Sequence, residues 1–141
     1  MAGRTELSRD TQIWGQPGSG IAGNTETAVI DMLGYESVMF IAIASATNAS
    51  NHLGFRMSTA SASGGMSDAT GETSGLTQVS VLDVFRPTKR YVQGRYSASG
   101  ATSPAVGIVA VVYGPRAEPT TQPSQTTVKR IYSPGSGTAT G

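Results

Sequence analysis

The side chains that could support chemistry are few in this chain, and their spacing matches no established catalytic or metal-binding pattern. The single histidine, His52, has no nucleophile motif such as G-x-S-x-G beside it. Asp68 and Glu72 lie four residues apart in a polar stretch, without the alternating oxygen ligands of a calcium loop. The chain has no cysteine, so the usual zinc ligand sets are missing. We therefore expect no enzymatic activity, no cofactor and no bound metal.

A glycine-rich stretch near the N-terminus, GQPGSG at residues 15–20, superficially resembles a phosphate-binding loop. It lacks the Gly-Lys-Ser/Thr ending, and it neither follows a predicted strand nor opens a predicted helix. We interpret this stretch as a linker.

A group of basic residues in the C-terminal half is the main candidate for a binding surface. Its members are Arg86, Lys89, Arg90 and Arg95, with Tyr91 and Tyr96 interleaved. Such a group could bind single-stranded nucleic acid through phosphate contacts and base stacking. However, its basic residues fall on both faces of a predicted strand, and the chain carries a net charge of only +1. We therefore favour ion pairs with the acidic N-terminal half or with a partner protein, and we expect no nucleic-acid partner.

Charge is distributed unevenly along the chain. Residues 1–85 contain three basic and eight acidic side chains, whereas residues 86–141 contain seven basic and one acidic. The two halves therefore attract each other. Strand pairing within one fold could satisfy this attraction, and so could subunits packed head to tail.

Short segments of β-type pattern, separated by turn residues, must position these side chains. The strands that we predict are 25–32, 37–46, 52–61, 76–85, 89–98 and 105–114. Residues 62–75 are interpreted as a polar loop, and no apolar helical period persists for three turns. No apolar run approaches the roughly 20 residues of a membrane-spanning helix. The pattern predicts an all-β fold, a jelly-roll-like antiparallel β-sandwich with extended N- and C-terminal arms.

Two of the predicted strands are apolar on both faces. In SVMFIAIASA, Val38 and Phe40 alternate with Met39 and Ile41, and AVGIVAVVYG shows the same pattern. A strand that is apolar on both faces is typical of a central or sandwiched position. The residues that we expect in the core or in a sheet interface are Tyr91, Val92, Ile108, Val109 and Val111.

Both ends of the chain differ in composition from the middle, so we divide it into an arm (1–23), a sandwich domain (24–115) and a tail (116–141). The arm is rich in glycine and contains the only tryptophan, Trp14; the tail contains three prolines. Each end holds an island suited to docking on an adjacent subunit, Trp14 in the arm and TTVKRIY (126–132) in the tail. Packing of Trp14 on its own domain is the alternative for the arm.

Three motifs carry a family resemblance: VIDMLGYESVMFIAI, then FRMSTASASGGMSDA, then KRYVQGRYSASGATSPAVGIVAVVYGPRAEP. Through them, residues 25 to 119 resemble small tailed-bacteriophage head proteins, the decoration or cement proteins. The resemblance implies a jelly-roll-like fold, attachment to the outer surface of the capsid and no enzymatic activity. Its implied partner is the major capsid protein.

We therefore expect a virion structural protein that bridges neighbouring capsid subunits, and a homo-oligomer, either dimer or trimer. The expected protein-interface residues are Trp14, Arg86, Lys89, Arg90, Arg95, Lys129, Arg130, Ile131 and Tyr132. The rival interpretation is a head-fibre or tail module that binds a receptor or a glycan through the polar loop at 61–75.

Overall fold

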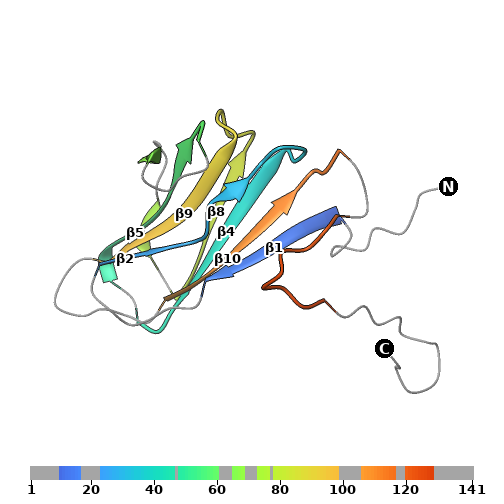
Figure 1. Cartoon of the computed structure of the whole chain (residues 1–141). Coiled ribbons are helices and arrows are strands. Elements are labelled where there is room, and N and C mark those ends of the chain that lie inside the picture. The colour runs from blue at the N-terminus through green and yellow to red at the C-terminus, as the bar shows by residue number, and fades with distance from the viewer. Residues whose placement is uncertain are drawn as a thin grey trace, which may run out of the picture.

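A computed structural model describes residues 10–16, 23–46, 48–60, 65–68, 73–76, 78–98, 106–116 and 120–128. Every regular element in this part of the chain is a β-strand, and all strand pairs are antiparallel. The strands form two sheets that face each other as a sandwich (Figure 1). The predicted all-β sandwich is confirmed. None of the described residues belongs to a helix with the length and apolar character that a membrane crossing requires.

Each sheet draws strands from both halves of the sequence. In order across the four-stranded sheet, the strands are β1 (Thr11–Gln16), β10 (Val106–Tyr113), β4 (Ser37–Ala44) and β8 (Val79–Phe85). The six-stranded sheet contains β2 (Gly23–Glu26), β9 (Tyr91–Ala98), β5 (Asn48–Ser58) and β6 (Ser67–Asp68), with β3 (Ile30–Asp31) also paired to β9 and β7 (Thr73–Leu76) also paired to β5.

The chain crosses between the sheets at most of its connections. If β2 with β3, and β6 with β7, are each counted as one interrupted strand, the chain has eight strand positions, four in each sheet. This order is compatible with the expected jelly roll, which also distributes eight antiparallel strands over two sheets.

The core lies between the inward faces of the two sheets. Its buried apolar side chains are Ile30, Met32, Val38, Phe40, Ala42, Ala44, Leu53, Val84, Val92, Tyr96, Val106, Ile108, Ala110 and Val112. The core also contains a polar contact, in which Asn51 donates a hydrogen bond from Nδ2 to the Tyr96 hydroxyl at 3.0 Å. Of the predicted core residues, Val92 and Ile108 are buried here, whereas Tyr91, Val109 and Val111 are half-buried on outward faces.

The N-terminal arm prediction is wrong for residues 11–16, which form β1. They pair along their whole length with β10, from Thr11 opposite Tyr113 to Gln16 opposite Ile108. Trp14 lies opposite Ala110, and its half-buried side chain packs against the core. The alternative that Trp14 packs on its own domain is therefore the correct one. Pairing with β10 and burial of the indole offset the entropy cost of ordering this short segment.

The described part of the C-terminal tail, residues 120–128, follows the outer edge of β1 (Figure 1). The Gln122 side-chain amide accepts from Ile13 N at 2.9 Å and donates to Thr11 O at 2.7 Å. Thr120 and Thr126 also donate hydroxyl hydrogen bonds to β1 carbonyls. The amide of Gln122 thus takes the place of a peptide group from a further strand. Residues 126–128, predicted as part of an added strand, are not in one.

Two other predictions need correction. The predicted polar loop at 62–75 contains β6 and the start of β7, which both pair with β5. The predicted strand 25–32 is interrupted at residues 27–29, because the register to β9 shifts by one residue between Glu26–Arg95 and Ile30–Val92. At this bulge, Thr27 N donates to Gly94 O, and Gly94 N donates to the Thr27 hydroxyl.

Candidate interaction surfaces

The structure separates the predicted basic cluster into two places. Arg86, Lys89 and Arg90 lie in the β8–β9 turn at one end of the sandwich, whereas Arg95 lies within β9 on the outer face of the six-stranded sheet. Four of the predicted interface residues lie outside the described part of the chain: Lys129, Arg130, Ile131 and Tyr132. Trp14, as described above, packs on its own domain.

The end of the sandwich that carries the β8–β9 turn is here called the basic end. Backbone hydrogen bonds join its segments: Arg116 N donates to Gly34 O at 2.8 Å, and Arg86 N donates to Glu36 O at 3.2 Å. Gly34 has a φ of 87°, a conformation that glycine adopts without steric strain. The backbone therefore holds the charged side chains of three separate loops close together.

The basic end has an excess of positive charge. Its charged side chains are Asp31, Glu36, Arg86, Lys89, Arg90 and Arg116. Arg90 donates two hydrogen bonds to Asp31, at 2.9 and 2.8 Å, and Arg86 forms an ion pair with Glu36 at 3.5 Å. Lys89 and Arg116 are exposed and form no ion pair with any other described residue. Two positive charges are thus left for a partner.

The Arg90–Asp31 pair changes the ionisation of both groups. Hydrogen bonds from the Arg90 guanidinium lower the pKa of Asp31 below its usual value, and the same bonds raise the pKa of Arg90. Each charge favours the charged form of its partner. Asp31 therefore stays ionised to a lower pH than an ordinary aspartate, and the ion pair links β3 to the residue that precedes β9.

The outer face of the six-stranded sheet holds a second charged group. Arg56 of β5 pairs with Glu26 at 3.4 Å and with Asp68 at 3.2 Å. Arg95 of β9 pairs with the same two carboxylates, at 3.5 and 3.1 Å. Strand register explains the arrangement, because Glu26 lies opposite Arg95 and Asp68 lies opposite Arg56. The four charges balance, so a ligand would have to compete with existing ion pairs.

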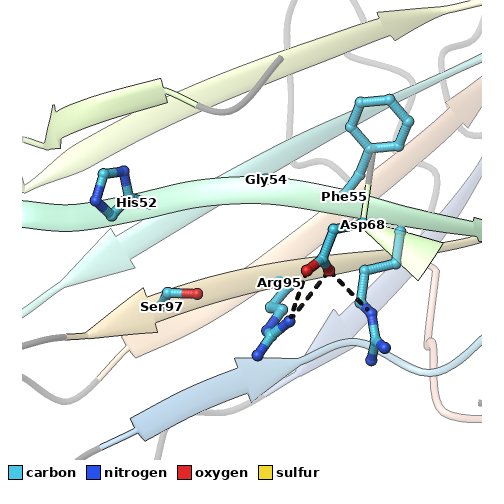
Figure 2. A pocket seen from close by; sticks show the side chains of 7 residues that line it. His52, Gly54, Phe55, Asp68, Arg95 and Ser97 are labelled. Carbon is cyan, nitrogen blue, oxygen red and sulfur yellow. Dashed lines mark hydrogen bonds and ion pairs between the residues drawn. The ribbon is translucent and has the colours of Figure 1, made fainter. Parts of the chain in front are cut away.

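A pocket of about 290 Å³ opens beside this group. Its lining includes His52 and Ser97, which lie opposite each other on β5 and β9. Figure 2 shows these two residues at one end of the pocket, whereas Asp68 is held by Arg95 at the other. Asp68 thus does not orient His52 as the acid of a catalytic triad would. Among the described residues, no group of three or more His, Asp or Glu side chains could hold a metal ion.

The outward face of the four-stranded sheet is apolar, and we call it the apolar face. Rows across the sheet follow the register: Ile13, Val111, Met39 and Asp83; Gly15, Val109, Ile41 and Val81; Gly107, Ile43 and Val79; Tyr113, Ser37 and Phe85. Four of these side chains are more than half exposed: Ile43 (54%), Val79 (58%), Val81 (51%) and Phe85 (63%). The one charged residue in these rows is Asp83, which accepts a 2.6 Å hydrogen bond from the Tyr113 hydroxyl.

Sequence reasoning identified neither the apolar face nor Arg56 as part of an interaction surface. The sequence did contain a signal for the apolar face, because two strands were predicted to be apolar on both faces. Arg56 could have been found from strand alternation, since it shares the outward face of β5 with His52.

No family model matches the chain, and no curated protein or solved structure shows a significant match to it.

Proposed function

We propose that this chain is a decoration or cement protein on the outside of a tailed-bacteriophage capsid. In this role it binds neighbouring major capsid protein subunits, joins them and performs no catalysis. The resemblance of residues 25 to 119 to that protein family supports the proposal. A β-sandwich is suitable for this role but is used for many others, so the interaction surfaces and not the fold support this function.

The observation that carries the proposal is the presence of two contact surfaces of different character. The apolar face exposes large side chains such as Val81 and Phe85, and the basic end exposes Lys89 and Arg116. A protein that connects subunits needs more than one surface for binding. Exposed apolar area of this kind is typical of protein–protein contacts, and unpaired charges direct the approach of an oppositely charged partner.

A bound decoration protein stabilises the assembled shell because it binds the assembled state and not its separated parts. We assign the capsid contact to the basic end, where the positive charges of Lys89 and Arg116 fit acidic side chains of the capsid protein. Because these charges are exposed, salt should weaken the attachment: the Debye length falls from about 10 Å at 0.1 M to about 3 Å at 1 M.

The test uses heads of the phage that encodes the chain, stripped of it and then mixed with purified protein. Hundreds of bound copies per head and a higher temperature of DNA release are expected for the wild type. The double variant Lys89→Glu with Arg116→Glu should bind weakly. The control, Gln78→Glu with Gln125→Glu, places the same two glutamates on other exposed positions and should bind normally. Normal binding by the first variant would remove the basic end from the proposal.

The copy number also tests the alternative, a head-fibre or tail module for a receptor or glycan. The polar pocket lined by His52, Arg56 and Ser97 favours this alternative, because sugars are bound by several converging polar groups. A handful of copies at one vertex or on the tail would contradict a cement protein. Loss of host or glycan binding in an Arg56→Ala variant would then support the alternative.

A further inference from the structure

We propose that a second copy of this chain covers the apolar face, so that two four-stranded sheets pack face to face in a two-fold dimer. This inference goes beyond the proposed function: it assigns the apolar face, one of the two contact surfaces of that proposal, to a second copy and leaves the basic end for the capsid. It is tested on the free protein in solution, so it can fail independently of capsid binding.

The first step is the position of the exposed apolar area within the sheet. At the β1 edge, side chains of the tail form hydrogen bonds with the backbone of β1. These side chains belong to Thr120, Gln122 and Thr126. The most exposed side chains lie at the other side, in β8 and at the end of β4. They are Ile43, Val79, Val81 and Phe85. The uncovered area is therefore centred on β4 and β8. Towards β1 it borders a pocket that tail residues 125–127 line together with Ile43 and Val109.

The second step concerns β8 as an edge strand. Natural edge strands are usually protected by lysines, prolines or bulges, because open edges invite pairing with other chains. Within β8, VSVLDVF, Asp83 is the one charged residue, and no proline or glycine is present. Protection thus exists at the β1 edge of the sheet and is nearly absent at the β8 edge. β8 therefore carries little that would keep a second copy away from its outward side chains.

The third step is the size of the face. Four strands about 4.8 Å apart and six to eight residues long, at about 3.3 Å per residue, outline roughly 450 Å². Two such faces in contact cover roughly 900 Å², and side-chain relief adds to this area, which brings it to the lower end for specific interfaces. This area lies within the range of the largest apolar patch on ordinary monomers, about 300–600 Å², and such patches are often functional. Its area is thus close to the minimum of about 1,000 Å² for a specific dimer interface.

The fourth step is the choice of occupant. A flat sheet face is complementary in shape to another sheet face, and stacked sheets pack about 10 Å apart. A second copy necessarily presents such a face. The face is nearly uncharged, so two copies meet with little like-charge repulsion. Its one carboxylate, Asp83, is already hydrogen-bonded to Tyr113 and lies one row from Val81, which we place near the two-fold axis.

The test measures the mass of the purified full chain by sedimentation equilibrium between about 1 and 100 µM. A dimer is expected for the wild type. Val81→Lys places a charge at the centre of the interface and should raise the dissociation constant at least ~100-fold, because like charges meet across it. Val81 is exposed in the single chain, so its circular dichroism spectrum should not change. The control Leu33→Lys alters an even more exposed apolar residue at the basic end and should remain dimeric.

A cross-linking measurement supplements the mass, because the chain contains no cysteine. Val81→Cys should form a covalent dimer with a short bismaleimide reagent, whereas Leu33→Cys should not. A monomeric wild type at 100 µM would overturn the proposal. A Val81→Lys variant that stays dimeric, or equal cross-linking of the two cysteine variants, would overturn it as well.

Discussion

Gly94 provides a sensitive test of how the two sheets pack. It lies in β9 of the six-stranded sheet, and Phe40 lies in β4 of the four-stranded sheet. A Cβ atom added at Gly94 would lie 2.5 Å from Cδ1 and 2.7 Å from Cε1 of the Phe40 ring. Optimal carbon–carbon contacts are about 3.5–4.0 Å, so the ring would have to move by roughly 1 Å. Phe40 is fully buried among the core side chains, so a movement of its ring would displace its neighbours.

We therefore predict that Gly94→Ala lowers the free energy of unfolding by about 2–3 kcal/mol, the upper part of the range for overpacked cores. With a urea m-value of about 2 kcal/mol/M, the midpoint of denaturation should fall by about 1 M or more. Urea unfolding followed by circular dichroism is the measurement. Gly15→Ala is the matched control, since a Cβ at that strand glycine meets nothing within 4 Å; its stability should change by less than about 0.5 kcal/mol.

A double-mutant cycle identifies the cause. Phe40→Leu removes the ring atoms that the new Cβ would contact, so the combined variant should be less destabilised than the sum of the two single variants. A coupling of about 1–2 kcal/mol is expected for residues in direct contact. Additive effects, or a stable Gly94→Ala protein, would show that Gly94 and Phe40 do not meet across the sandwich, and the face-to-face arrangement of β9 and β4 would have to be abandoned.

Two further predictions concern the tail and the basic end. Gln122→Ala should lower stability by about 1–2 kcal/mol and speed hydrogen exchange at the Ile13 amide, which loses its acceptor; unchanged protection of that amide would contradict the role of the tail as a cover for β1. Because Arg90 lowers the pKa of Asp31, the stability from this pair is present above the ordinary aspartate pKa of about 4 and is lost as pH falls through the lower folded-state pKa. An Asp31→Asn variant should therefore show a smaller drop in melting temperature between pH 6 and pH 2 than the wild type, and an identical drop would argue against the pair.

Much of the sandwich could be predicted because its strands are long enough to show their own pattern. Residues 37–44 and 106–113 are continuous β-type runs, and both form central strands of one sheet. β1 could not be predicted in this way. It has six residues, one of them Gly15, and its partner β10 begins 90 residues after it ends. Both the strand that pairs with β1 and the tail residues that hydrogen-bond to its other edge are distant in sequence. A local sequence pattern therefore cannot reveal either contact.

The interaction surfaces were harder to predict than the strands, because proximity in sequence does not place side chains on one surface. Arg90 and Arg95 are five residues apart, which in an extended strand separates their Cα atoms by roughly 16 Å. Arg90 accordingly lies at the basic end, and Arg95 lies in a charge-balanced group with Glu26 and Asp68. Arg116, which comes from a distant part of the sequence, joins the basic end through its backbone bond to Gly34.

The outer faces of the two sheets differ in composition. In β4 and β10, both faces are apolar, although the six-stranded sheet covers just one of them. A surface that faced water permanently would allow polar residues at positions such as Ile41, Ile43 and Val109, as the outer face of the six-stranded sheet does with Arg56 and Arg95. The outer face of the four-stranded sheet is thus apolar, whereas the outer face of the six-stranded sheet is charged. This difference is explained if the outer face of the four-stranded sheet becomes buried in an assembly. The apolar residues on this face then indicate a partner surface that the single chain does not supply.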